Sequence, residues 1–248
     1  MNIDAVTIEA SVQRTHWWFE GRRRLLGRLL KDLDPKPAWR VLDVGAGTGA
    51  NLPVLESLGV GRVIGCDLSV DALRHASRAT RTAPVRADAC QLPFTSGSID
   101  LLIATDVIEH LDDDRGALQE FARVLRPGGH FVVTVPAFQS LWGPQDIVAH
   151  HRRRYRRETL LPLFQPAGLR VAKCFHFNYL LFAPIWAARK LLLALRVPVS
   201  SENAINGRLL NAVLTRVFYL DVDTAARVNA PFGVSLCVLG LRAREPHT

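Results

Sequence analysis

The sequence contains few cysteines, no long apolar run and no signal-like beginning. Its four cysteines lack the paired spacing of a zinc site or a disulfide framework, so we expect buried thiols in a reducing, cytoplasmic compartment and no metal site. No apolar stretch is long enough to span a membrane. The first ten residues include Asp4 and Glu9 and lack the basic and apolar regions of a secretory signal.

Acidic residues are in the minority. There are 23 aspartates and glutamates against 31 lysines and arginines, for a formal net charge of +8. Arginines cluster at Arg22–Arg24 and Arg152–Arg157. Two interpretations stay open, a solvated basic surface and a surface for an anionic partner such as a phosphate-bearing substrate or a membrane. Nucleic acid is not expected, because no nucleic-acid-binding module accompanies the charge.

The most informative stretch is residues 40–52, RVLDVGAGTGANL. Its apolar run predicts a buried strand, its three glycines predict a turn with almost no side-chain bulk, and a helix follows. Glycine can take positive φ and lets a ligand approach the backbone closely. The free N–H groups of the following helix point to the same place. We therefore expect a nucleotide-like ligand at this turn, with the Asp43 carboxylate beside it.

Strands and helices alternate from residue 40 onward. Such alternation predicts an α/β fold with a Rossmann-like, doubly wound, mainly parallel sheet and helices on both faces. Ligands of such sheets bind beyond the carboxyl ends of the strands. The predicted strands are 40–44, 62–66, 84–87, 99–105, 130–135, 169–175 and 234–241, and the predicted helices are 21–33, 51–58, 70–79, 115–125, 159–164, 179–195 and 203–219.

The flanks of this core are less regular. The aromatic group His16–Phe19 stands just before the first predicted helix, where it either staples that helix to the sheet or forms a lid over the glycine turn. A polar, aromatic and basic loop covers 137–158, and a helical insertion, 178–230, precedes the last strand. We expect one domain made of an N-terminal helical segment (1–37), a core (38–136) and a substrate-facing part (137–248).

Two further carboxylates follow predicted strands. Asp67 ends the second strand in GCDLS, where it can accept hydrogen bonds from both ribose hydroxyls of an adenosine. Asp88 ends the third strand in RADACQLPF and is placed to accept from an adenine amino group, with Ala89 supplying a backbone N–H. Thr105 lies at the mouth of the fourth strand. These residues indicate an adenosine-containing ligand.

The ordered segments VLDVGAGTG, GCDLS, ADACQLPF, FTSGSIDLLIATDVIEHL and LRPGGHFVVTVP resemble the class I S-adenosylmethionine-dependent methyltransferases over residues 38–136. A nicotinamide-dependent Rossmann enzyme is disfavoured, because the turn is GAGTG and not GxGxxG. The resemblance implies a seven-stranded sheet with an antiparallel last strand. It also implies S-adenosyl-L-methionine as the cofactor and S-adenosyl-L-homocysteine as the product.

The same resemblance assigns a cofactor site. In that family the glycine turn holds the amino-acid part of the cofactor, the acid after the second strand holds the ribose, and the acid after the third strand holds the adenine. The lid interpretation of the aromatic group adds one tryptophan and one arginine. The residues carried over are Asp43, Gly45, Gly47, Asp67 and Asp88, with Ala46, Ala89 and Thr105 as further contacts, and the expected cofactor-binding residues also include Leu68, Trp18 and Arg22.

The flanks resemble a narrower bacterial group of uncharacterised or secondary-metabolism methyltransferases, which begin with HWWF…GRR and carry W-G…D…H-RRY after the fifth strand. An oxygen or nitrogen acceptor often must lose a proton, and the best candidate bases are His151 and then His150. The residues expected to face the acceptor are Trp142, His110, Arg154 and Tyr155. A structural role stays open for each, including pairing of Arg154 with Asp146.

We expect O-methylation of a small apolar or natural-product-like acceptor. Two alternatives stay open, a membrane-surface methyltransferase acting on a lipid or lipid-linked sugar and a non-catalytic homologue that binds the cofactor. The very apolar segment 179–195 caps the acceptor, forms a homodimer face or lies on a membrane as a peripheral helix.

Overall fold

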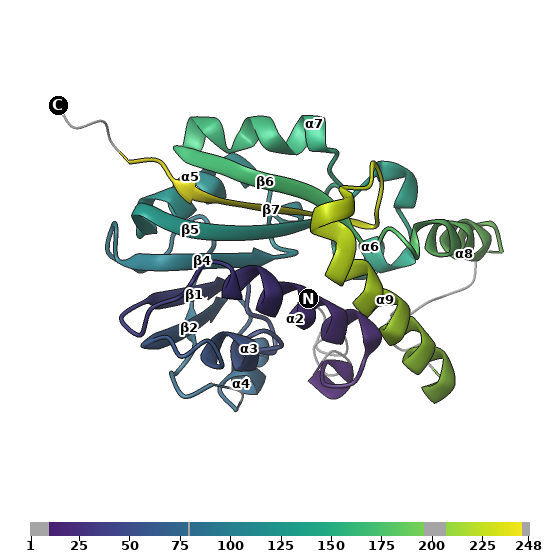
Figure 1. The fold of residues 1–248 in the computed structure, drawn as a ribbon, viewed down its shortest axis with the longest axis horizontal. Helices are drawn as coiled ribbons and strands as arrows, with labels where there is room; N and C mark the ends of the chain where they lie inside the picture. The colour runs from purple at the N-terminus through teal and green to yellow at the C-terminus, as the bar shows by residue number, and fades with distance from the viewer. Residues whose placement is uncertain (1–9, 79, 196–206, 245–248) are drawn as a thin grey trace.

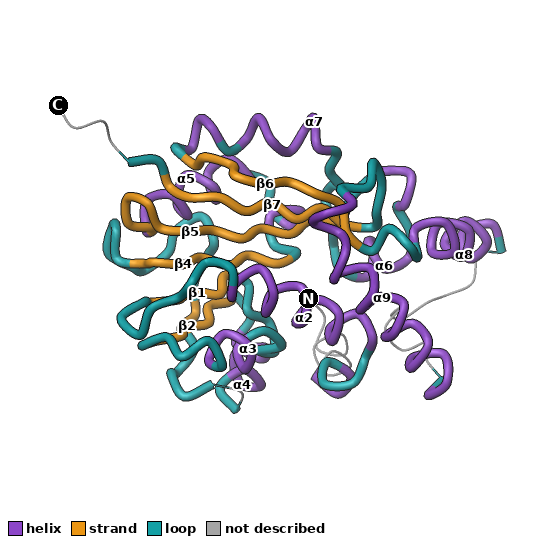
Figure 2. The backbone as a smooth tube through the Cα atoms, viewed as in Figure 1, coloured by secondary structure: helices purple, strands orange, loops and turns teal. Residues whose placement is uncertain are grey.

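A seven-stranded sheet forms the centre of the molecule (Figures 1 and 2). The computed structural model describes residues 10–78, 80–195 and 207–244. The strands lie in the order β3-β2-β1-β4-β5-β7-β6. Their bounds are β1 Arg40–Val44, β2 Arg62–Asp67, β3 Val85–Arg86, β4 Ile99–Thr105, β5 Leu125–Pro136, β6 Leu169–Phe177 and β7 Ser235–Arg242.

The sheet is mainly parallel. β1 to β5 pair in parallel, whereas β7 runs antiparallel to both β5 and β6. The predicted Rossmann-like sheet with an antiparallel last strand is therefore confirmed. The chain order reverses between β1 and β4, and ligands of open α/β sheets bind at the carboxyl edge of such a switch point.

Helices cover both faces of the sheet. One apolar cluster gathers α5 and the segment around α7 against β4 and β5, and the other gathers α2, α3 and α9 on the opposite face. Because both faces are covered, the central strands are apolar on both sides. The helices are α2 Trp17–Lys31, α3 Leu52–Glu56, α4 Val70–Ala76, α5 Asp114–Val124, α6 Pro144–Val148, α7 Arg157–Leu160, α8 Phe182–Ala194 and α9 Arg208–Val228, with 3₁₀ turns η1 Ile108–His110, η2 Gln139–Leu141, η3 Leu161–Leu163 and η4 Gln165–Ala167.

The N-terminal aromatic group forms the start of α2, with His16 as its N-cap and Trp17, Trp18 and Phe19 in its first turn. The predicted start at residue 21 is wrong, because the helix already begins at Trp17. The side chain of His16 provides the cap, since its Nδ1 accepts a hydrogen bond from the Trp18 N–H at 3.3 Å. Burial lowers the pKa of His16 to about 4, so the ring is neutral and able to accept at neutral pH.

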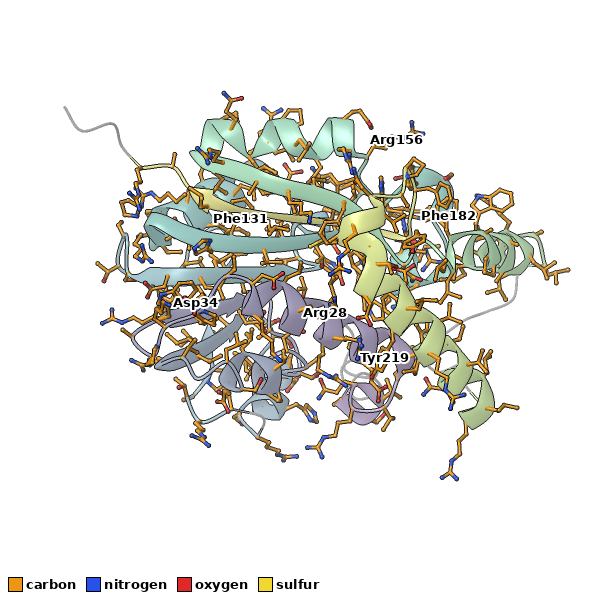
Figure 3. The ribbon with its side chains drawn as sticks, viewed as in Figure 1. Arg28, Asp34, Phe131, Arg156, Phe182 and Tyr219 are labelled. Carbon is orange, nitrogen blue, oxygen red and sulfur yellow. The ribbon has the colours of Figure 1, made fainter. Side chains whose placement is uncertain are left out.

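α2 packs closely against α9 (Figure 3, where Arg28 and Tyr219 mark the two helices). Gly21 allows the approach, because a Cβ at that position would lie 2.1 Å from the ring of Phe218. The Trp18 ring stacks on Phe218 with centroids 5.4 Å apart, and on Phe177 of β6 at 6.0 Å. The aromatic group therefore staples α2 to α9 and to the sheet.

The insertion between β6 and β7 contains α8 and α9, as the sequence predicts. The helix predicted over 203–219 continues to Val228, and residues 203–206 lie outside the described part of the chain. The second half of α9 contains the buried Asp221, whose partners the sequence does not reveal. Its carboxylate accepts hydrogen bonds from the N–H groups of Asn178 and Leu180 at 2.6 and 2.8 Å. α8 lies at the edge of the molecule, away from the sheet (Figure 1).

The predicted start of the fifth strand is also wrong. β5 begins at Leu125 and not at residue 130, because Leu125 already pairs with Ile99 of β4. Among the helices that the described residues form, none combines the length and the apolar character that crossing a bilayer requires.

Candidate active site

The candidate site lies at the carboxyl edge of the sheet. A hollow of about 360 Å³ exists elsewhere, at the amino ends of the strands, where Arg40, Arg62 and Ile99 contribute to its lining. Ligands of parallel sheets bind at the opposite edge, so the glycine turn after β1 is the better candidate.

The glycine turn is built on positive φ angles. Gly45, Gly47 and Gly49 have φ of 66°, 54° and 89°, values that other residues rarely adopt. A Cβ at Gly45 would also lie 2.5 Å from the side chain of Val107. The Ala46 N–H donates to the Cys66 carbonyl at 2.9 Å and ties the turn to β2. The turn thus presents backbone, with almost no side chain, at the carboxyl edge.

Asp67 connects β2 to this turn. Its carboxylate accepts hydrogen bonds from the N–H groups of Gly47 at 2.9 Å and Ser69 at 2.8 Å. A carboxylate has about four acceptor positions, so both oxygens keep capacity for ligand hydroxyls. The neighbouring Leu68 side chain is 61% exposed and offers an apolar surface beside it.

Asp88 follows the short strand β3. Its carboxylate accepts from the Cys90 N–H at 2.8 Å, which closes a tight turn, and its side chain is otherwise exposed. Ala89 is half-buried in the same turn. β1, β2 and β3 are neighbouring parallel strands, so Asp67 and Asp88 lie at the same carboxyl edge of the sheet as the glycine turn.

Asp43 is a buried acid within β1. Its side chain is fully buried, forms no ion pair within the described residues and lies beside the Asn51 amide, whose hydrogen bond favours the ionised carboxylate. Burial raises the pKa of Asp43 to about 7, and the positive charge of Arg22 opposes that rise. A carboxyl group with this pKa becomes ionised when a cationic ligand approaches it.

Arg22 reaches the carboxyl edge from α2. Its Nη1 lies 2.8 Å from Oδ2 of Asp106, the residue directly after β4. Asp106 has a φ of 56°, and its N–H donates to the carbonyl of Thr134 in β5. The preceding Thr105 accepts a hydrogen bond from Asn51 at 3.0 Å. Arg22 therefore fastens α2 to the mouth of β4.

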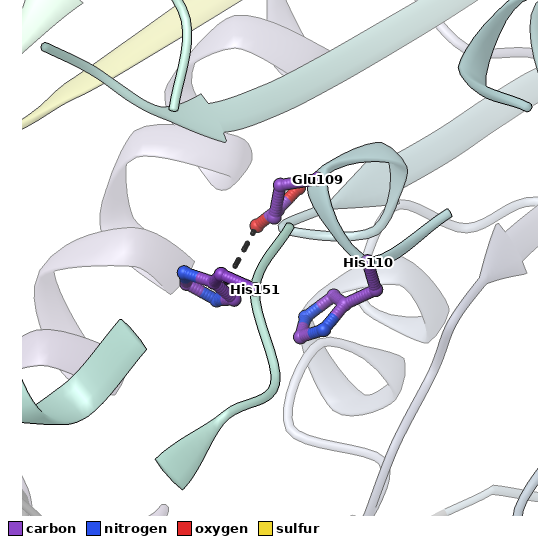
Figure 4. A group of neighbouring side chains, drawn as sticks. All are labelled: Glu109, His110 and His151. Atoms are coloured by element: carbon purple, nitrogen blue, oxygen red, sulfur yellow. Dashed lines mark ion pairs between the residues drawn. The ribbon is translucent and has the colours of Figure 1, made fainter. Parts of the chain in front are cut away.

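A second group of side chains gathers beyond β4: Glu109, His110 and His151 (Figure 4). Nε2 of His151 lies 3.9 Å from Oε1 of Glu109, and the rings of His110 and His151 meet edge to face with centroids 4.7 Å apart. Burial, reinforced by the charge of Asp106, raises the pKa of Glu109 well above its usual range. Burial and the adjacent His151 lower the pKa of His110 to about 4.

Asp146 holds the loop that carries His151. The fully buried carboxylate contacts His151 Nδ1 at 2.8 Å, Arg154 Nε at 2.7 Å and Arg154 Nη2 at 3.0 Å. It also accepts from the Gly143 N–H at 2.8 Å. Burial alone would raise the pKa of Asp146, but the hydrogen bond with His151 and the charge of Arg154 outweigh it and lower the pKa to about 2.

Two residues predicted to face the acceptor, Arg154 and Tyr155, are buried and have partners within the protein. Arg154 is buried and forms the bidentate ion pair with Asp146, so the structural alternative holds for this arginine. Tyr155 is 3% exposed, and its hydroxyl donates to Asp114 at 2.8 Å. Their contacts hold the loop in place.

The remaining predicted residues have mixed placements. Trp142 is half-buried between η2 and α6, at the end of the loop that Asp146 organises. His150 is exposed and has a φ of 57°, whereas the adjacent His151 turns inward. Trp18 belongs to the aromatic stack between α2 and α9. Its predicted contact with the cofactor, and the catalytic roles of the two histidines, stay predictions.

Sequence reasoning missed several residues of this site. Glu109 stands in the segment DVIEHL, and only its burial reveals it, because an acid beside a 3₁₀ turn has no distinctive spacing. The sequence indicates Asp146 as a partner for an arginine but does not reveal that it also contacts His151 and the Gly143 N–H. Asn51 and Arg189 are buried near the two halves of the site, Arg189 with Nη1 2.9 Å from the Leu141 carbonyl.

Comparison with known proteins identifies a methyltransferase domain in the core of the chain. Residues 42–133 match the family model described as a methyltransferase domain. A demethylmenaquinone methyltransferase of Corynebacterium kroppenstedtii is 34% identical over 118 residues, which cover 45% of this chain and 51% of the relative. An O-methyltransferase of Pyrenophora dematioidea is 28% identical over 164 residues, 61% of each chain. The chain thus spans about half the length of the curated relatives it matches.

Solved structures share the whole fold. The methyltransferase in a complex with the Trm112 activator of Haloferax volcanii has a TM-score of 0.64 at 20% identity, covering 99% of this chain and 97% of that one. A Thermotoga maritima protein described as an S-adenosylmethionine-dependent methyltransferase, possibly a histamine N-methyltransferase, has a TM-score of 0.62 at 17% identity, covering 97% and 96%. The resemblance to the class I methyltransferases is therefore confirmed for the core sequence and for the fold.

Proposed function

We propose that this protein is an S-adenosylmethionine-dependent methyltransferase that transfers a methyl group to an oxygen of a small-molecule acceptor. The observation that carries the proposal is the hydrogen bond from the Gly47 N–H to Asp67, which joins the glycine turn to the end of β2. Asp88 follows the next strand of the same edge. The family-model match covers all three residues and supports the same cofactor.

The residues of the glycine turn fit the parts of this cofactor. Asp67 keeps acceptor positions for ribose hydroxyls, and Asp88 with the Ala89 N–H offers an acceptor and a donor for adenine. The bulk-free backbone at Gly45–Gly47 admits the methionine part, whose ammonium group suits the buried Asp43. When bound, the cofactor supplies a methyl group on a cationic sulfonium with a neutral thioether as the leaving group.

Glu109, His110 and His151 lie where we expect the acceptor to bind. Alignment of acceptor, methyl and sulfur contributes roughly 7–11 kcal/mol to such a displacement, so the acceptor side must be held rigidly. The ion pair of Asp146 with Arg154 fixes the loop that carries His151. An acceptor hydroxyl must also lose its proton, and we propose that the hydroxyl lies beside Glu109, His110 and His151 when it does so.

The names of the relatives indicate the kind of acceptor. One relative is named an O-methyltransferase, and another is named a demethylmenaquinone methyltransferase. We infer an apolar or natural-product-like hydroxylated acceptor for this chain.

Calorimetry with S-adenosylmethionine and S-adenosylhomocysteine tests the proposal. We expect both to bind, and Asp67→Asn or Asp88→Asn to weaken binding by about tenfold or more, as loss of a charged hydrogen-bond acceptor does. Asp71→Asn, on the exposed side of α4, is the control and should leave affinity unchanged. Binding of neither ligand would overturn the proposal. Binding without transfer to any hydroxylated acceptor in a panel would favour the non-catalytic alternative.

A second candidate, action at a membrane surface, is favoured by the exposed apolar surface of α8 and the start of α9. Its exposed side chains include Trp186 at 43%, Leu191 at 58% and Leu209 at 82%. The described residues 179–195 and 207–220 contain arginines and a lysine but no aspartate or glutamate. An apolar surface bearing only positive charges suits an anionic bilayer that presents a lipid acceptor.

Co-sedimentation with vesicles distinguishes the two candidates. At low salt the second predicts binding to phosphatidylglycerol vesicles, weaker binding to phosphatidylcholine vesicles and loss of binding in Leu191→Gln/Leu209→Gln. No binding to either vesicle would exclude it, and concentration-dependent dimerisation lost in the same variant would assign this surface to a second copy of the chain.

A further inference from the structure

We propose that Glu109, His110 and His151 form a binding site for a divalent transition-metal cation. One ligand atom from each lies within 4.8 Å of the others, and the three side chains come from η1 and from the loop after α6 (Figure 4). Two imidazoles and one carboxylate suit Mn²⁺, Fe²⁺, Co²⁺ or Zn²⁺ and leave coordination positions open. The cation site stands on this geometry, and only its part in catalysis rests on the proposed function.

Glu109 is the observation that points to a ligand. Its side chain is fully buried, and neither oxygen has a hydrogen-bond partner within the described residues. Buried carboxylates are normally paired or bound to metals, because an isolated charge is costly to bury. His151 is too far for a hydrogen bond, at 3.9 Å. A cation between them would supply the missing partner.

His151 is oriented as a ligand. Asp146 contacts its Nδ1 at 2.8 Å and is itself fixed by Arg154. With Nδ1 bound to a carboxylate, Nε2 carries the lone pair and faces Glu109. Metal-ligating histidines almost always have their other ring nitrogen held by a carboxylate or carbonyl in this way.

The backbone also fixes the two halves of the site relative to one another. The Arg152 N–H donates to the Glu109 carbonyl at 2.9 Å, and the Arg152 side chain donates to the His110 carbonyl at 3.0 Å. Ligand atoms around one such metal lie roughly 3 Å apart, given bonds of about 2.0–2.2 Å. The ligand atoms, within 4.8 Å of one another, must therefore draw closer around a bound cation, while the Arg152 hydrogen bonds keep the two segments together.

A cation here would explain how an acceptor hydroxyl is activated. A hydroxyl bound at an open position would have a lowered pKa and would release its proton to water. The oxygen lone pair then forms the bond to the methyl carbon, while the carbon–sulfur bond breaks and its electrons stay on the neutral thioether. In this arrangement His151 is a ligand of the cation and not the base predicted from the sequence.

Metal titration of the full chain tests the site. After treatment with a chelator, the protein is titrated with Mn²⁺ and the free ion is followed by electron paramagnetic resonance; Co²⁺ absorption gives a second reading. We expect one ion per chain, lost in Glu109→Gln and in His151→Gln. Asp146→Asn should weaken binding 10–100-fold, as loss of an outer carboxylate does. His75→Gln, on α4, is the matched histidine control and should bind normally.

The outcomes separate this inference from the proposed function. Circular dichroism and S-adenosylhomocysteine calorimetry show whether each variant is folded, and His110→Gln provides a third variant at a half-buried position. No saturable Mn²⁺ or Co²⁺ binding, or binding that persists in the folded Glu109→Gln/His151→Gln variant, overturns the cation site. If the protein binds the cofactor but binds no cation, only this inference is refuted. If it binds the cation but neither S-adenosylmethionine nor S-adenosylhomocysteine, only the proposed function is refuted.

Discussion

The two sides of the candidate site use charge in opposite ways. On the cofactor side, Asp67 and Asp88 accept backbone N–H groups at strand ends, and Asp43 forms no ion pair within the described residues. On the acceptor side, the arginines of the loop are paired, as Arg154 with Asp146 and Arg153 with Asp114 show. Carboxylates without an arginine partner at the sheet edge therefore indicate where a ligand binds. The arginine–aspartate pairs instead hold the loop in place, and we call them the paired framework.

Glu109 is the exception on the acceptor side. It is buried like Asp146 but lacks the arginine that neutralises Asp146. Glu109 is therefore the position on the acceptor side where a cation would supply a missing partner.

The largest expected effect comes from breaking the paired framework. Asp146→Asn leaves Arg154 buried without its counter-charge, and loss of one partner of a buried pair costs about 3–5 kcal/mol. We expect that decrease in the free energy of unfolding, measured by urea denaturation. Asp112→Asn removes the exposed partner of Arg152 and should cost only about 0–1 kcal/mol. Similar costs for the two variants would contradict the distinction between framework and surface pairs.

The next effect falls on the cofactor side. Gly45→Ala forces a side chain into a positive φ, for about 1–2 kcal/mol, and into contact with Val107, for about 1–3 kcal/mol more. Gly59→Ala has a similar φ of 70° but open space, so it should show the first cost only. Denaturation of both variants isolates the steric part. S-adenosylhomocysteine affinity should fall in Gly45→Ala and not in Gly59→Ala.

The unpaired Asp43 predicts a pH dependence. Its pKa of about 7 in the folded protein exceeds its unfolded value of about 3.8, so between these values the folded state holds a proton that the unfolded state has released. Stability must then fall as the pH rises from 5 to 7, by up to about 1.4 kcal/mol per pH unit.

Asp43→Asn isolates this dependence. Relative to the variant, the wild-type protein should lose roughly 2 kcal/mol between pH 5 and 7 in urea denaturation at matched ionic strength. Parallel stability curves would show that Asp43 is already ionised at pH 5, which would remove the reason to regard it as awaiting a cationic ligand.

The cofactor side was predictable because its signals are local. A glycine turn, an acid at a strand end and an apolar strand are each written within a few consecutive residues, so the sheet and the positions of Asp67 and Asp88 followed from the sequence. The start of α2 was not predictable from periodicity, because His16 caps the helix with an imidazole nitrogen instead of one of the preferred oxygen side chains.

The acceptor side was harder because its interactions join distant segments. Whether Arg154 meets a ligand or Asp146, and whether Glu109 meets any partner, depends on how the loop folds back on η1. Burial decided these questions, and the sequence of a charged loop does not indicate burial. The same limit applies to α8, because its apolar sequence does not distinguish a cap, a dimer face and a membrane-surface helix, and only the structure shows that Trp186 and Leu191 are exposed.

The smallest expected effect concerns that exposed surface and tests whether α8 belongs to the framework. Arg189 anchors the helix, with Nη1 2.9 Å from the Leu141 carbonyl and 3.8 Å from Asp146. Leu191 makes no comparable contribution, since it is 58% exposed, so Leu191→Gln should change the free energy of unfolding by no more than about 0.5 kcal/mol. The buried Leu52 is the reference, and Leu52→Ala should cost about 2–5 kcal/mol. A cost for Leu191→Gln that approaches the reference, and that grows with protein concentration, would mean that a second chain covers α8 in solution; a small and concentration-independent cost leaves the surface free for a bilayer.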